Sequence, residues 1–249
     1  MDPYVAEFVG TLILVLLGNG VVANVVLPQT KGSDGGWIVV SFGWGMAVFV
    51  AVWCVGPFSG AHLNPAVTVG LAAGTADFSW ASVPGYLVSQ MLGAIVGATL
   101  VYVFYRDHYA VCDDAGAKLA TFATAPAIRR ASSNLISEIV GTVVLVFGVL
   151  LAVNPSIEVA GETASTMTLG MGTLGALPVG LLVFAIGLSL GGTTGYAINP
   201  ARDLGPRIAH ALLPIPGKGA GDWGYAWIPV LGPIIGGIVA AVLFRALVA

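Results

Sequence analysis

Six long apolar stretches limit what this 249-residue chain can fold into more than any other feature. Each is long enough for a helix across the hydrocarbon core of a bilayer, which takes about 20 residues. Only 8% of the residues are charged, against roughly 25% in an ordinary soluble domain. We therefore predict an all-α membrane protein with spans at about 5–27, 37–58, 84–105, 133–153, 177–192 and 226–247.

The remaining composition excludes several classes of partner. A net charge of −3 without a run of Lys or Arg argues against nucleic acid and against polybasic attachment to anionic lipids. Cys54 and Cys112 lie far apart without a CxxC motif or a His cluster, so we expect two free thiols, no metal site and no cofactor. The first apolar stretch lacks a basic start and reads as a membrane span instead of a cleavable signal peptide.

Two connections between the spans differ in character. The segment at about 106–132 contains seven charged residues, and we expect it to lie in water. The segment at about 154–176 has little charge, and we expect it to fold partly against the helices.

The chain contains an internal repeat. AEFVGTLILV (6–15) matches SEIVGTVVLV (137–146), and GAHLNPAVT (60–68) matches GYAINPARD (195–203). Each unit holds three crossings, so the second copy must enter the membrane from the opposite face. We predict one transmembrane domain over 1–249, built of two inverted repeats at about 1–110 and 131–249 and joined by the polar loop.

A short stretch follows Asn-Pro-Ala in each repeat, and each is half as long as a membrane span. Asn is a favoured N-cap and Pro suits the first helical position, so Asn64-Pro65 and Asn199-Pro200 predict helices running to about Gly74 and about Leu212. Half-helices that enter from opposite faces would meet at the midplane with their positive N-terminal ends together. Non-helical backbone at that depth requires burial in protein or contact with water.

The segments that lead into the half-helices should be extended and should present a ladder of carbonyl oxygens. The ladder residues are Gly60, Ala61, His62, Leu63, Gly195, Ala197 and Ile198. The amides of Asn64 and Asn199 add donors halfway along it. An unpaired hydroxyl costs about 4–8 kcal/mol in hydrocarbon, so such a lining would pass a polyol that lipid excludes.

These motifs, together with the paired AEFVGT and SEIVGT segments, resemble the aquaporin superfamily, the major intrinsic protein family, over essentially the whole chain. The Asp at position 203, directly after Asn-Pro-Ala-Arg, makes the chain resemble the glycerol-facilitator branch of this family. The resemblance implies six transmembrane helices plus two half-helices, and a homotetramer with one pore in each subunit. It also implies that the two Asn-Pro-Ala motifs form the pore centre: Asn64, Pro65, Ala66, Asn199, Pro200 and Ala201.

Arg202 is the only basic residue inside the motifs, and a charge near mid-membrane costs about 2.5–3.5 kcal/mol even on the lenient insertion scale. This cost favours a side chain that faces a pore. The resemblance places Arg202 in a selectivity filter with Trp44, Gly187 and Tyr196. It makes Trp44 part of an apolar corner and lets Gly187 leave room for the solute, whereas aromatic packing or an interfacial belt is the alternative for Trp44 and Tyr196.

Three acidic residues read as supports. Glu7 and Glu138 lie in spans one and four, where the resemblance makes each an acceptor that holds the loop before a half-helix, with proton relay as the alternative. Asp203 should support the backbone around Arg202. For His62 we expect a carbonyl in the ladder and a ring in packing, without a metal.

We predict a passive channel, and no enzyme, for small uncharged solutes: chiefly glycerol, with water, small polyols, urea or undissociated lactic acid. Ions and protons would be excluded. The alternatives are a water-selective aquaporin, a proton-coupled secondary transporter and a scaffold with a vestigial pore. The basic loops lie opposite the termini and would place the termini outside. The resemblance places them in the cytoplasm, at the cell membrane, with lipid and further copies of the chain as partners.

Overall fold

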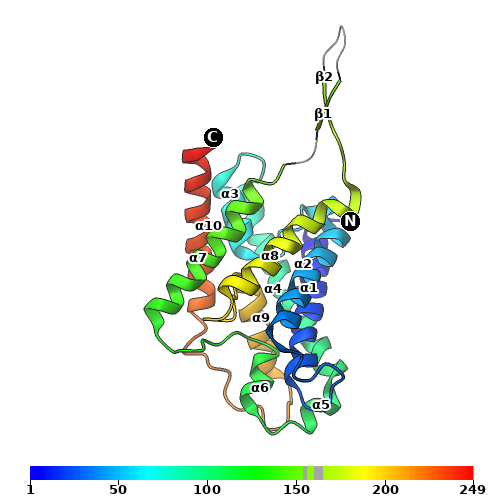
Figure 1. Cartoon of the computed structure of the whole chain (residues 1–249), viewed down its shortest axis with the longest axis vertical. Coiled ribbons are helices and arrows are strands. Elements are labelled where there is room, and N and C mark those ends of the chain that lie inside the picture. Colours follow the sequence, from blue (N-terminus) through cyan, green and yellow to red (C-terminus); the bar gives the residue numbers. More distant parts are fainter. Residues whose placement is uncertain (154–155, 160–164, 249) are drawn as a thin grey trace.

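The computed structural model describes residues 1–153, 156–159 and 165–248. Six helical segments are long and apolar enough to cross a membrane, which confirms the predicted number of spans. They are α1 (Pro3–Val26), α2 (Gly36–Ser59), α4 (Val83–Phe104), α7 (Ala131–Leu150), α8 (Leu177–Leu190) and α10 (Ile228–Leu247). Short 3-10 turns lengthen two of them, η1 (Trp80–Ser82) before α4 and η2 (Gly172–Ala176) before α8. Both ends of the chain lie toward one end of the bundle in Figure 1.

Two half-helices occupy the positions that the Asn-Pro-Ala motifs predict. α3 (Pro65–Gly74) and α9 (Pro200–Leu212) start at the proline, and the side chain of the preceding Asn caps each of them. Proline is well placed at the first helical position because its missing N–H would have no partner there. In Figure 1, α3 lies toward the end of the bundle with the C-terminus, and α9 lies below it, toward the opposite end.

The two repeats are packed into each other. α3 of the first repeat contacts α10 and α7 of the second, while α9 of the second repeat contacts α4 of the first. α2 and α8 also pack across the repeat boundary. Each half-helix is therefore held mainly by the last long helix of the opposite repeat.

Small residues bring the helices within a repeat close together. An added Cβ at Gly97 of α4 would lie 2.6 Å from the carbonyl oxygen of Leu12 in α1. In the second repeat, a Cβ at Gly236 of α10 would lie 2.6 Å from the carbonyl oxygen of Ile139 in α7. Since lipid supplies no hydrophobic force between helices, close backbone packing of this kind is a main source of their association.

The long polar connection is more ordered than we expected. It contains α5 (Arg106–Ala110) and α6 (Ala115–Ala120), at the end of the bundle opposite the termini in Figure 1. Tyr109 and Phe122 are fully buried in a cluster that includes residues of α1, α4 and α9. The charged residues of the segment apart from Lys118 are exposed, in agreement with the prediction, while its apolar residues complete the core at that end.

The second connection also differs from the prediction. β1 (Ser156–Val159) and β2 (Ser165–Thr168) pair antiparallel, with Ser156 opposite Thr168 and Val159 opposite Ser165. In Figure 1 this hairpin extends beyond the helices, whereas η2 packs against α2 and α8. Folding against the helices was therefore correct only for the last part of the segment; residues 154–155 and 160–164 lie outside the described chain.

Of the two free cysteines, Cys112 is buried in the cluster beside α5 and α6. Cys54 is exposed on α2.

Candidate functional site

The tips of α3 and α9 meet through a crossed pair of hydrogen bonds. The Asn64 side-chain amide donates to the carbonyl oxygen of Ile198 at 2.8 Å, and the Asn199 amide donates to that of Leu63 at 2.9 Å. The side-chain oxygen of each Asn caps its half-helix: that of Asn64 accepts from the Ala66 N–H, and that of Asn199 accepts from the Ala201 N–H. Each amide group has two N–H donors, so this geometry uses one donor of each Asn and leaves the second for another acceptor.

Glu7 fixes the backbone that leads into α3. Its carboxylate accepts the N–H groups of His62 at 2.9 Å and Leu63 at 2.7 Å, and it also accepts from the side chains of Ser59 and Gln90. The whole side chain is buried. A buried carboxylate is tolerable only when its oxygens are hydrogen-bonded in this way.

Glu138 has the equivalent place before α9. It accepts the N–H groups of Ala197 at 3.0 Å and Ile198 at 2.8 Å. Both carboxylates thus accept N–H groups of the approach segments. They leave the carbonyl groups of these segments for other donors.

We had expected the approach segments to be extended, but four of their non-glycine residues are not. Ala61 and Leu63 have φ angles of 50° and 51°, and Tyr196 and Ile198 have 38° and 41°. Positive φ is unfavourable for residues with a side chain, so the surrounding bonds must hold this conformation. The Leu63 and Ile198 carbonyls of the predicted ladder each accept one Asn amide, and each keeps a second lone pair for another donor.

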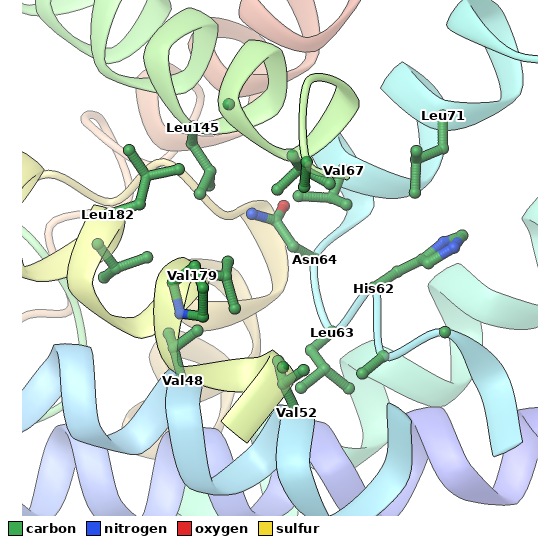
Figure 2. Close-up of a pocket in the computed structure, with 18 of the residues that line it drawn as sticks. Val48, Val52, His62, Leu63, Asn64, Val67, Leu71, Leu145, Val179 and Leu182 are labelled. Carbon is green, nitrogen blue, oxygen red and sulfur yellow. The ribbon is translucent and has the colours of Figure 1, made fainter. Parts of the chain in front are cut away.

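A cavity of about 570 Å³ reaches this centre from the η2 side. Its wall includes the backbone from Gly60 to Leu63, both asparagines and a larger set of apolar side chains. Figure 2 shows Asn64 among Val67, Leu145, Val179 and Leu182, while the ring of His62 points away from them. A mainly apolar wall with a few fixed polar groups suits a small molecule that carries both C–H and hydroxyl groups.

The four residues of the expected filter lie apart from that cavity, and all four are buried; Trp44, Tyr196 and Arg202 are 4–7% exposed. The guanidinium carbon of Arg202 lies 4.1 Å from the centroid of a Trp44 ring, in a cation–π arrangement. Within the described chain, no hydrogen bond of that guanidinium is found, although the Arg202 backbone N–H donates to Asn199. Among the described residues, its N–H donors therefore have no hydrogen-bond acceptor.

Gly187 and Tyr196 are in direct contact. An added Cβ at Gly187 would lie 2.9 Å from both Cζ and the hydroxyl oxygen of Tyr196. The space that we expected Gly187 to leave for a solute is thus occupied by the phenol ring. Trp37, which the sequence did not single out, packs edge-on to that ring and donates from its indole to the Gly187 carbonyl at 2.8 Å.

Asp203 makes different contacts from those we predicted. One carboxylate oxygen accepts from the N–H and hydroxyl of Thr124, both at 2.7 Å, and the other pairs with Arg207 at 2.8 Å. Arg207 is fully buried and donates five hydrogen bonds, two to Asp203 and three to the carbonyls of Thr124, Gly221 and Asp222. The pair therefore joins α9 to two loops instead of supporting the backbone around Arg202.

The sequence contained a signal for this pair that we did not use. Asp203 and Arg207 are four residues apart, which places them on one face of a helix. For Thr124 no local signal exists, because it reaches Asp203 from another part of the chain.

The centroid of the His62 ring lies 4.5 Å from that of Phe78 and 4.8 Å from that of Tyr86. The Nδ1 atom of His62 lies 3.2 Å from the Thr68 hydroxyl oxygen. Thr68 also accepts from Gln90, which links His62 to Glu7. Among the described residues, no group of three His, Cys, Asp or Glu side chains is placed to hold a metal ion.

Comparison with known proteins agrees with this geometry. The family model described as Major intrinsic protein matches residues 1–244. The chain belongs to the major intrinsic protein family. A probable glycerol uptake facilitator protein of Thermotoga maritima is 56% identical over 245 residues, covering 98% of this chain and 99% of that protein.

Other members of the major intrinsic protein family are also similar over nearly the full length. The glycerol uptake facilitator protein of Bacillus subtilis is 51% identical, covering 99% of this chain and 85% of its own. The aquaglyceroporin of Plasmodium falciparum superimposes with a TM-score of 0.83 at 30% identity, over 99% of this chain and 96% of its own. The fold is thus that of an aquaporin, and the chain is a multi-pass membrane protein.

Proposed function

We propose that the chain is a passive transmembrane channel that conducts small uncharged solutes, chiefly glycerol, with water as a second permeant. The crossed asparagines carry the proposal: they place two positive helix ends and free amide donors at the end of a mainly apolar cavity. The names of the relatives, glycerol uptake facilitators at 50–56% identity, support glycerol as the main solute. No bond is made or broken by such a protein, so it is not an enzyme.

The proposed path runs from the cavity past the asparagines to Trp44, Tyr196 and Arg202. Backbone carbonyls would accept hydrogen bonds from solute hydroxyls, and the apolar wall would contact the carbon chain. Arg202 would donate to solute oxygens, since its guanidinium donors have no acceptor within the part of the chain that the structure describes. Its charge and the two helix ends would repel cations and interrupt a chain of hydrogen-bonded waters.

We propose that the channel lies in the cell membrane with both termini in the cytoplasm. Loop charge alone argues for the reverse, but three of the basic residues opposite the termini have specific partners. Lys118 donates to the Pro216 carbonyl, Lys218 to three carbonyls at the end of α9, and Arg129 to Asp222. These cations are held by the fold, which supports reading them as structural instead of as topology signals. The two repeats would form one channel unit, and four chains would assemble with one pore in each.

Stopped-flow light scattering of proteoliposomes tests the function. Under an inward glycerol gradient, vesicles with the protein should swell faster than empty vesicles, with a low activation energy and without dependence on ions or a pH gradient. Saturating uptake driven by protons would identify a coupled transporter. Water flux without glycerol flux would identify a water-selective channel, and no flux of either would leave only a structural role.

A further inference from the structure

Two aromatic side chains of the proposed constriction each rest against a glycine that lies outside the motifs. Gly18 of α1 faces the indole of Trp44, and Gly191, just after α8, faces the phenol of Tyr196. We propose that Gly18 and Gly191 are positioning residues that set the width of the constriction, because each aromatic ring occupies the space that a side chain at its glycine would need. This inference rests on the proposed function.

The contact at Gly18 leaves no room for a methyl group. A Cβ there would overlap three atoms of the six-membered ring of Trp44, Cζ3, Cε3 and Cη2, at separations far inside the roughly 3.5–4.0 Å of carbon atoms in contact. The same indole also carries the guanidinium of Arg202, whose carbon lies 4.1 Å from the ring centroid. A side chain at position 18 must therefore displace the indole on which Arg202 stacks, or push the helices apart.

The contact at Gly191 has the same character. A Cβ there would lie 2.5 Å from Cδ1 of Tyr196 and 2.8 Å from Cζ2 of Trp37, and it would also lie 2.6 Å from the backbone carbonyl oxygen of Gly187. The far end of the phenol is already against Gly187, at 2.9 Å from the position of a Cβ. The ring thus fits between two glycines and the edge of Trp37, and a methyl group at position 191 would displace it.

Neighbouring glycines provide matched controls. At Gly20 of α1 and at Gly192 beside Gly191, nothing in the described chain lies within 4 Å of an added Cβ. Both have ordinary backbone angles. Gly20→Ala and Gly192→Ala therefore change the same chemical group in the same segments without touching either ring.

The experiment measures glycerol and water permeability of reconstituted Gly18→Ala, Gly191→Ala and the two controls, each normalised to folded protein. We expect the ratio of glycerol to water permeability to fall by roughly ten-fold in Gly18→Ala and Gly191→Ala, equivalent to about 1.4 kcal/mol of barrier. Gly20→Ala and Gly192→Ala should keep the wild-type ratio. The inference is overturned if Gly18→Ala has the same permeability ratio as Gly20→Ala, and Gly191→Ala the same ratio as Gly192→Ala. A wild-type protein without glycerol flux would instead overturn the proposed function.

A double variant separates positioning from general damage to the helices. Trp44→Phe removes the ring atoms that face Gly18, so adding Gly18→Ala to it should cost neither folded yield nor permeability ratio. If Gly18→Ala lowers the yield or the ratio as much beside Phe as beside Trp, the glycine acts through helix packing and the inference fails. This comparison remains decisive if Gly18→Ala alone does not fold.

Discussion

Arg202 and Arg207 lie five residues apart on α9, and the protein uses their guanidinium groups in opposite ways. Arg207 donates five hydrogen bonds to neighbouring groups, whereas the Arg202 guanidinium lies against Trp44 without a hydrogen bond inside the described chain. Buried guanidinium groups are normally paired, because desolvation of the charge is costly. The contrast assigns Arg207 to the scaffold and supports the proposal that Arg202 donates to a passing solute.

Replacing Arg202 should therefore change conduction more than stability. Arg202→Ala removes the fixed charge beside Trp44, and we expect a measurable proton or cation leak together with a lower preference for glycerol. A pH-sensitive dye inside proteoliposomes reports the leak. Arg130→Ala, which removes an exposed cation from the loop before α7, serves as the control and should stay proton-tight. A tight Arg202→Ala channel would remove this residue from the barrier to ions.

Replacing Arg207 should have the opposite result. Arg207→Met leaves the buried Asp203 carboxylate without its charge partner, and loss of one member of a buried pair costs about 3–5 kcal/mol. Thermal unfolding in detergent measures the loss. In the double variant Asp203→Asn/Arg207→Met, the cost should be smaller than the sum of the single costs, because no carboxylate remains unpaired.

The ion pair between Arg129 and Asp222 offers a comparison with different burial. It is 2.5 Å long but lies at the surface, with 59% of the Arg129 side chain exposed, and its hydrogen bond to Asp222 raises the pKa of Arg129. Arg129→Ala should shift the unfolding midpoint little, since exposed pairs typically contribute under about 1 kcal/mol. A shift as large as that of Arg207→Met would show that the outer loops, and not burial, determine the cost.

At the centre, Asn199→Asp is expected to separate capping from conduction. The carboxylate can still accept the Ala201 N–H, so α9 keeps its cap, but it cannot donate to the Leu63 carbonyl. Its negative charge would also offset the positive helix ends. We predict folded protein with reduced glycerol flux and raised cation conductance, measured by swelling and by planar-bilayer recording. Unchanged selectivity would argue that the helix ends do not govern ion exclusion.

Substitutions of the buried carboxylate of Glu138 test whether the protein is a channel or a proton-coupled transporter. Glu138→Gln retains an acceptor for one of the two N–H groups that Glu138 binds, and flux should survive without any dependence on a proton gradient. Glu138→Ala leaves both N–H groups of the segment unpaired, at about 1–3 kcal/mol each, and should lower folded yield. If Glu138→Gln abolished a pH-driven component of uptake, the carboxylate would be a proton carrier.

Local sequence rules were sufficient for the spans and the half-helices. Asn followed by Pro carries its own capping chemistry, so the start of α3 and α9 could be read without knowledge of their surroundings. Hydrophobic length did the same for the long helices, although it did not indicate the 3-10 turns η1 and η2 that precede α4 and α8. The repeat then indicated that the two motifs face each other.

Contacts between distant segments could not be read in this way. Three features depend on which segments meet in space. They are the burial of Phe122, the hydrogen bonds from Thr124 to Asp203, and the position of Trp37 against Tyr196. The positive φ angles at Ala61 and Tyr196 are imposed by the carboxylates behind them, and residues of this type normally avoid that region. The roles of Trp44, Gly187, Tyr196 and Arg202 in selection remain predictions, since position alone does not measure permeation.

The crossed amides have a consequence for how such a protein can be divided. Asn64 takes its acceptor from residue 198 and Asn199 takes its acceptor from residue 63, so neither repeat completes its own tip. A solitary repeat would have to find a second copy inserted upside down. Expressed as two separate polypeptides, the halves should regain transport only when they are produced together, as an antiparallel heterodimer.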